Sequence, residues 1–106
     1  MRIEQHRLQV RSSSPPVVEI DTQARAVYVR FKKAAVFKTV TQPGGTSLHI
    51  AVDLDRNGEV IGIEAVGSDE FGLEVILKKA KVDVPPALAA RARYVTAKMA
   101  LAGTTD

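Results

Sequence analysis

The sequence contains no cysteine and no tryptophan, and only 5% of its residues are aromatic. The absence of cysteine excludes disulfides, thiol nucleophiles and thiolate metal sites. A chain of 106 residues must then be held by packing alone, and it is long enough for one domain with its own core. With 45% hydrophobic and 25% charged residues, its composition is that of a globular protein and not of a disordered one.

Long apolar runs are also missing from the sequence. No stretch approaches the roughly 18 to 20 apolar residues of a membrane-spanning helix. Residues 1–7 lack the apolar core of a signal peptide. We therefore expect a cytoplasmic protein without a membrane partner.

Acidic residues are scarce at both ends of the chain. Residues 1–40 carry eight Lys and Arg against three acids, residues 41–76 carry one against seven, and residues 77–106 carry six against two. The net charge of +3 is therefore the sum of a basic, an acidic and a second basic block along the chain. Such a chain can pair with itself, associate head to tail or offer a basic surface to a polyanion, although solvated charges without a partner are the commonest outcome.

Residues suited to catalysis are few. His6 and His49 are the two histidines, too few for a histidine metal site. No serine stands in a G-x-S-x-G context, and Gly44-Gly45 leads into an alternating apolar run, so neither a nucleophile elbow nor a phosphate loop is indicated. We expect no enzyme activity, no cofactor and no metal site.

Alternating apolar residues predict a series of strands that follows a Ser/Pro hinge at residues 11–16. The clearest strand covers residues 48–54, where every second residue is a large apolar one. Four further runs have the β-branched and aromatic content of strands, and turn residues separate them: residues 17–20, 26–31, 36–41 and 61–66.

The apolar period then changes to that of a helix. Four apolar residues share one helical stripe: Leu73, Ile76, Leu77 and Ala80. Ser68 would be the N-cap, and lysines in the last turn would complement the helix dipole. A strand over residues 71–77 is the competing interpretation, which this placement of charge disfavours.

A second helix is predicted to begin at Pro86, because proline is well tolerated at the first helical position. Its apolar stripe would consist of Leu88, Ala92, Val95 and Met99. The helix would end near Gly103.

These elements predict an α+β fold, with a four- to five-stranded antiparallel sheet of hairpins followed by one or two C-terminal helices. Residues 1–16 would form an N-terminal arm and hinge. The domain would cover residues 17–102, with a sheet core at 17–67 and a helical extension at 68–102. Because so small a sheet leaves edges and an apolar face to cover, we expect a homodimer.

Residues 53–64 allow two incompatible interpretations. The pattern of an EF-hand calcium loop is matched in full by Asp53, Asp55, Asn57, Gly58 and Glu64. A calcium loop of this kind lies between two helices, whereas residues 43–52 contain a proline, two glycines and a strict two-residue alternation. We therefore favour a β-hairpin with a tight turn at residues 55–58, and a calcium-binding loop at 53–64 is the alternative.

Interaction through charge is the function that this distribution favours. The candidate interaction surface consists of Asp53, Asp55, Glu59, Lys78, Lys79, Arg91 and Arg93. Phosphate contacts from the basic ends make a weak electrostatic nucleic-acid-binding protein the alternative. The low aromatic content disfavours it, since Tyr28 is the one aromatic residue on a predicted polar strand face.

Two stretches resemble a known family. Residues 26–31 read Ala-Val-Tyr-Val-Arg-Phe, and residues 52–64 read Val-Asp-Leu-Asp-x-x-Gly-x-Val-Ile-Gly-Ile-Glu. They are similar to a strand and an acidic hairpin of the small bacterial domain-of-unknown-function family numbered 2283. The similarity covers residues 17–67, with Gly62-Ile63-Glu64 as its most specific part, and it departs from the family at Ile20 and Arg25.

That resemblance implies an antiparallel sheet with one helical face and no established activity. Some members of the family are encoded beside small toxin-like proteins, which implies an antitoxin or regulatory role at family level. We therefore expect a small non-enzymatic binding or regulatory module with a protein partner.

Overall fold

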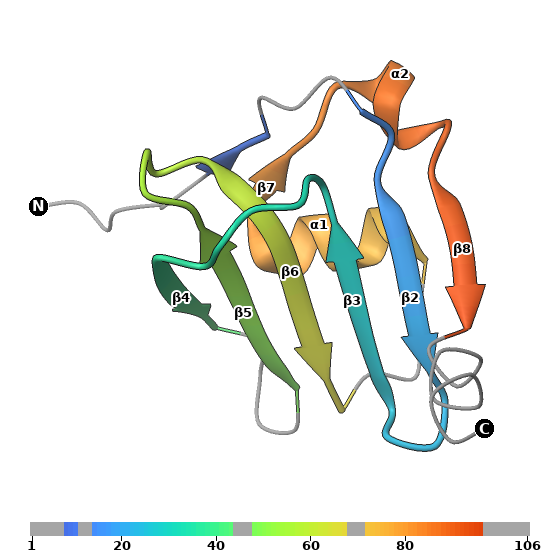
Figure 1. Cartoon of the computed structure of the whole chain (residues 1–106). Coiled ribbons are helices and arrows are strands. Elements are labelled where there is room, and N and C mark those ends of the chain that lie inside the picture. Colours follow the sequence, from blue (N-terminus) through green and yellow to red (C-terminus); the bar gives the residue numbers. More distant parts are fainter. Residues whose placement is uncertain (1–7, 11–13, 44–47, 68–71, 97–106) are drawn as a thin grey trace, which may run out of the picture.

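The computed structural model describes residues 8–10, 14–43, 48–67 and 72–96 (Figure 1). In chain order its elements are β1 (Leu8–Gln9), β2 (Val17–Asp21), β3 (Ala26–Arg30), β4 (Lys38–Gln42), β5 (His49–Leu54), β6 (Val60–Val66), α1 (Leu73–Ala80), β7 (Val82–Asp83), α2 (Pro86–Ala89) and β8 (Arg93–Thr96). Over these ranges, neither helix has the length and apolar content that crossing a membrane would require.

Six of the strands form one sheet in the order β4-β5-β6-β3-β2-β8. Neighbouring strands are antiparallel except β2 and β8, which run parallel. The α+β class is confirmed. The sheet is larger than predicted and mixed, where the sequence indicated four or five antiparallel strands.

The additional strand comes from residues predicted to be helical. α2 begins at Pro86 as expected but makes a single turn, and the chain then continues as β8. The predicted helical stripe is wrong at Val95, which lies in β8, whereas Met99 lies outside the described residues. Aromatic and β-branched side chains at residues 94–96 favour a strand, and β2 offers them an edge for pairing, which outweighs helical periodicity.

The apolar side chains of the sheet gather on one face, and α1 packs against that face (Figure 1). In β2 and β3 the buried residues are Val18, Val27 and Val29, and in α1 Leu73 and Ile76 lie in the same cluster. The predicted helix is thus confirmed. The apolar face that we expected a second copy to cover is covered by α1 itself, so only the edges of the sheet remain as an argument for a dimer.

The ends of α1 differ in part from the prediction. Its N-cap is Gly72, which makes no side-chain cap, and Ser68 lies outside the described residues. Glu74 supplies the acid of the first turn, and the lysines of the last turn lie where the sequence placed them. Lys81 ends the helix in the left-handed conformation, with φ of 59°.

α1 spans the sheet from one edge strand to the other. At its start, the backbone N–H of Leu73 donates to the Tyr94 hydroxyl of β8 at 3.2 Å. At its end, the buried amide of Gln42 in β4 donates to the Ala80 carbonyl at 2.9 Å. That carbonyl has no partner within the helix, so Gln42 satisfies a group that burial would otherwise leave unpaired.

Part of the predicted N-terminal arm belongs to the core. β1 pairs in parallel with β7, with Leu8 opposite Val82. Val10 follows β1 and is buried in the same apolar cluster as the sheet. Residues 8–10 are therefore packed on the domain, whereas residues 1–7 and 11–13 lie outside the described ranges.

Gly62 lies next to a bulge and has a close neighbour on the adjacent strand. The register between β5 and β6 shifts by one residue between Asp53 and Leu54, which marks a bulge next to Gly62. The ring and hydroxyl of Tyr28, on the adjacent β3, occupy the space that a Cβ at Gly62 would need. A glycine at this position is therefore required by the packing of the tyrosine.

We expect Gly62→Ala to destabilise the fold by about 1–3 kcal/mol, because the Tyr28 ring would have to leave its place. Urea unfolding measures the loss. Gly72→Ala is the control, since an added Cβ there meets no atom within 4 Å. In the double variant with Tyr28→Val the cost of the alanine should shrink, and strict additivity of the two single costs would contradict the explanation.

Candidate functional site

The structure does not bring the seven predicted interaction residues together. Asp53, Asp55 and Glu59 belong to the β5–β6 hairpin. Lys78 and Lys79 are exposed at the end of α1 that is bound to β4, at one edge of the sheet. Arg91 and Arg93 are exposed beside and on β8, at the opposite edge. The basic residues therefore do not form one continuous surface for a polyanion.

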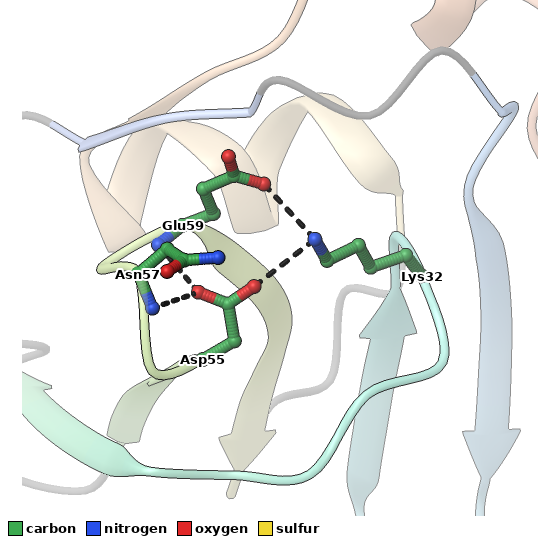
Figure 2. A network of polar contacts seen from close by, with 4 residues as sticks. All are labelled: Lys32, Asp55, Asn57 and Glu59. Atoms are coloured by element: carbon green, nitrogen blue, oxygen red, sulfur yellow. Dashed lines mark hydrogen bonds and ion pairs between the residues drawn. The ribbon is translucent and has the colours of Figure 1, made fainter.

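The turn between β5 and β6 is built around the carboxylate of Asp55 (Figure 2). Its Oδ1 accepts hydrogen bonds from the backbone N–H groups of Asn57 and Glu59, at 2.9 and 3.0 Å. Gly58 has φ of 81° and donates to the Asp55 carbonyl at 2.9 Å. These features confirm the predicted hairpin with its tight turn, which uses a glycine at the left-handed position.

The structure of residues 53–64 can also be compared with that of an EF-hand calcium loop. The motif residues are flanked by β5 and β6, so the helix–loop–helix frame of an EF-hand is not formed. Within the described ranges no three His, Asp or Glu side chains are grouped as metal ligands would be. The Asp55 side chain is buried and is engaged by the turn.

Lys32 completes this cluster from the segment that follows β3. Its Nζ lies 3.0 Å from Oδ2 of Asp55 and 2.9 Å from Oε1 of Glu59 (Figure 2). The hydrogen bonds to Glu59 and Asp55 raise the pKa of Lys32. The Glu59 backbone N–H and then the Lys32 ammonium hold the pKa of Asp55 below its usual value of 3.8. The cluster is therefore an internal ion pair that holds the turn.

A second polar network lies on the face of the sheet opposite α1. The Tyr28 hydroxyl donates to Oδ2 of Asp53 at 3.0 Å, and the Thr39 hydroxyl donates to Oδ1 at 2.8 Å. Arg30 lies over the Tyr28 ring, 5.3 Å from its centroid, and pairs with Glu19 at 3.0 Å. The network joins β2, β3, β5 and β4 and passes over Gly62 of β6, so it ties the sheet together across this face.

The pKa of Tyr28 is raised within this network. Burial is the largest cause, followed by the hydrogen bond to Asp53 and the negative charge of that carboxylate. The phenol therefore stays protonated as a donor, and the arrangement lacks the lowered pKa that a catalytic tyrosinate needs.

A patch of exposed apolar and basic side chains lies at the segment that crosses from β3 to β4. In Figure 1 this segment passes in front of β6 and β5, on the side away from α1. Phe37 is 63% exposed and Val36 53%, although the Phe37 backbone N–H is held by the Leu54 carbonyl at 2.8 Å. The Arg56 guanidinium lies over the Phe37 ring, 5.6 Å from its centroid.

We define the Phe37 patch as Lys33, Val36, Phe37, Lys38 and Arg56. Sequence reasoning placed residues 36–41 in a strand and so missed it, because β4 begins only at Lys38. The signal in the sequence is that residues 34–37 are consecutively apolar without alternation and have lysines on both sides. That pattern suits an exposed loop better than a half-buried strand.

A hollow of about 430 Å³ lies between the start of α1, α2 and β8. Leu73, Val75, Pro86 and Tyr94 line it with mainly apolar surface, and Glu74 is the one charged residue among its lining. The titratable side chains of its lining are those of Glu74 and Tyr94.

We expect the Asp55 cluster to make stability depend on acid pH. A carboxylate whose folded pKa is lowered stabilises the fold above its usual pKa, and this contribution is lost as the pH falls through the folded pKa. Asp55→Asn should therefore be less stable at neutral pH and lose less on acidification below about pH 4. Urea unfolding from pH 2 to 7 checks this, with Glu74→Gln as control. An unchanged acid slope in Asp55→Asn would argue against the cluster.

Tyr28 should titrate above its usual value of 10.0 in the folded protein. In the Tyr94→Phe variant it is the only tyrosine, so phenolate absorbance reports it alone. Adding Asp53→Asn should lower the midpoint, because it removes the negative charge but leaves the burial. Glu64→Gln is the matched control. Equal midpoints with and without Asp53→Asn would contradict the proposed contact.

No protein-family model matches the chain, and the searches of curated proteins and of solved structures gave no match either. The resemblance to the family numbered 2283 therefore stays a prediction, based on the residues of its strand and hairpin.

Proposed function

We propose that this chain is a small non-enzymatic binding module that takes up an acidic segment of a partner protein at the Phe37 patch. The observation that carries the proposal is the exposure of Phe37 and Val36 in the middle of three cations. Phe37 is 63% exposed, so a partner that covers it would remove the apolar surface of an aromatic ring from water. An apolar centre with a charged rim is the usual anatomy of a protein-binding site.

The cations of the patch are free to act on a partner. Lys32 is neutralised by Asp55 and Glu59, but Lys33 and Lys38 form no ion pair with the described part of the chain. Arg56 is engaged with the Phe37 ring alone over the same ranges. Rim charges of this kind chiefly raise association rates and select partners of opposite charge.

The backbone of the patch is held in place before binding. Phe37 is anchored through its N–H to Leu54, and the segment before it is anchored through Lys32 to the hairpin turn. A segment fixed at both ends loses little conformational freedom when a partner binds. Phe37 therefore has the properties of a binding hot spot: aromatic, exposed and positioned in advance.

Single-stranded nucleic acid is the second candidate ligand, and the same aromatic ring among cations favours it. A base could stack on Phe37 while lysines contact phosphates. The patch offers one exposed aromatic side chain, whereas nucleic-acid modules commonly stack several bases. An acidic protein segment is therefore the better fit.

We expect Phe37→Ala to weaken partner binding about tenfold, or about 1.4 kcal/mol, because it removes the apolar anchor. The first probe is a labelled peptide of alternating Glu and Leu, and the second is a co-encoded toxin-like neighbour, both measured by fluorescence anisotropy. Val66→Ala is the matched control, since Val66 is another exposed apolar residue, 36% exposed, on β6. Equal affinities for Phe37→Ala and Val66→Ala would refute the assignment.

The basic rim is tested with two variants of equal charge. Lys33→Ala/Lys38→Ala should weaken binding of the acidic peptide and make the remaining binding less sensitive to salt, because fewer charge contacts are left to screen, whereas Lys78→Ala/Lys79→Ala should leave both unchanged. A labelled oligo(dT) is the nucleic-acid arm. Tighter binding of oligo(dT) than of the acidic peptide would replace the protein partner by the nucleic-acid candidate.

A further inference from the structure

β8 is an edge strand of the six-stranded sheet, and all four of its residues are exposed. Its inner side pairs in parallel with β2, where the Arg93 N–H donates to the Pro16 carbonyl at 2.9 Å. The two faces of a parallel sheet are ordinarily covered. An unpaired edge strand, in contrast, is a template for a further strand. We propose that β8 pairs antiparallel with β8 of a second copy of the chain.

The direction of the backbone groups follows from the pairing with β2. N–H and C=O groups alternate along a strand, and those of Arg93 point to β2. Val95 shares that direction, so Tyr94 and Thr96 present their N–H and C=O groups to the outer edge. Two donors and two acceptors are thus available on the outer edge of each copy.

The residues of this edge fit a second copy of themselves. If the helical faces of both copies lie on the same side, Tyr94 of one copy stands opposite Thr96 of the other, and the two Val95 residues meet at the twofold axis. Each Tyr94–Thr96 pair exchanges two backbone hydrogen bonds and sets an aromatic side chain beside a β-branched one. Residues 94–96 carry no charge, so the pairing brings no like charges together.

The other edge of the sheet is protected against such pairing. β4 begins at Lys38 and is followed by Pro43, and lysine and proline at an edge both disfavour strand addition. β8 also begins with a cation, Arg93, but it contains no proline and is not followed by one. Tyr94 is also held in advance by the hydrogen bond between its hydroxyl and the Leu73 N–H of α1. These contrasts select β8 as the edge that associates.

A strand of four residues buries less area than a standard protein interface, so the dimer should be weak, with Kd on the order of 100 μM. Analytical ultracentrifugation of the full chain between about 10 μM and 1 mM should show a mass that rises from 11.4 kDa toward twice that value. A constant mass of 11.4 kDa throughout would overturn the proposal.

Thr96→Pro tests the edge itself, because it removes an outward N–H and leaves the bonds to β2 in place. Thr96→Val is the matched control that keeps both the N–H and the β-branch. We expect Thr96→Pro to stay monomeric and Thr96→Val to dimerise like the parent, with folding of both confirmed by NMR. Dimerisation of folded Thr96→Pro at parental strength would show that a different surface associates and would reject the proposal.

Discussion

The ammonium group of Lys32 between the carboxylates of Asp55 and Glu59 is the contact on which the arrangement of this molecule depends. It joins the segment leaving β3 to the turn between β5 and β6, and β6 is the neighbour of β3 in the sheet. The turn fixes the register of β5 and β6, and the segment anchored on it crosses their face before entering β4. Together with the hydrogen bond from the Phe37 N–H to the Leu54 carbonyl, that anchor holds the segment that carries the Phe37 patch.

The two faces of the sheet are stabilised by different interactions. One face is apolar and buried under α1, so it is stabilised by removal of surface from water. The other face is held by a polar network that runs from Glu19 through Arg30 and Tyr28 to Asp53. Because these groups pair with one another, those that are partly buried do not carry the cost of an unpaired polar atom.

The sequence pattern predicted the structure correctly where one local interaction determines it. Alternation predicted β5, and the Asp-x-Asn-Gly run predicted the turn, since both depend on neighbours in sequence. The strand formed by Tyr94 and Val95 could not be predicted from the sequence pattern. Their spacing is helical, and the edge of β2 with which they pair lies far away in the chain. Phe37 was missed for a related reason: its exposure follows from where Lys32 and Leu54 hold the crossing segment.

The pairing of β1 with β7 has a consequence for how the chain reaches this state. Leu8 meets Val82, so two segments from opposite ends of the sequence must find each other. The β2–β3 and β5–β6 hairpins close short loops and can form early, whereas this contact closes a loop that contains nearly the whole sheet. During synthesis, Val10 therefore has no complete site to enter until β7 has left the ribosome.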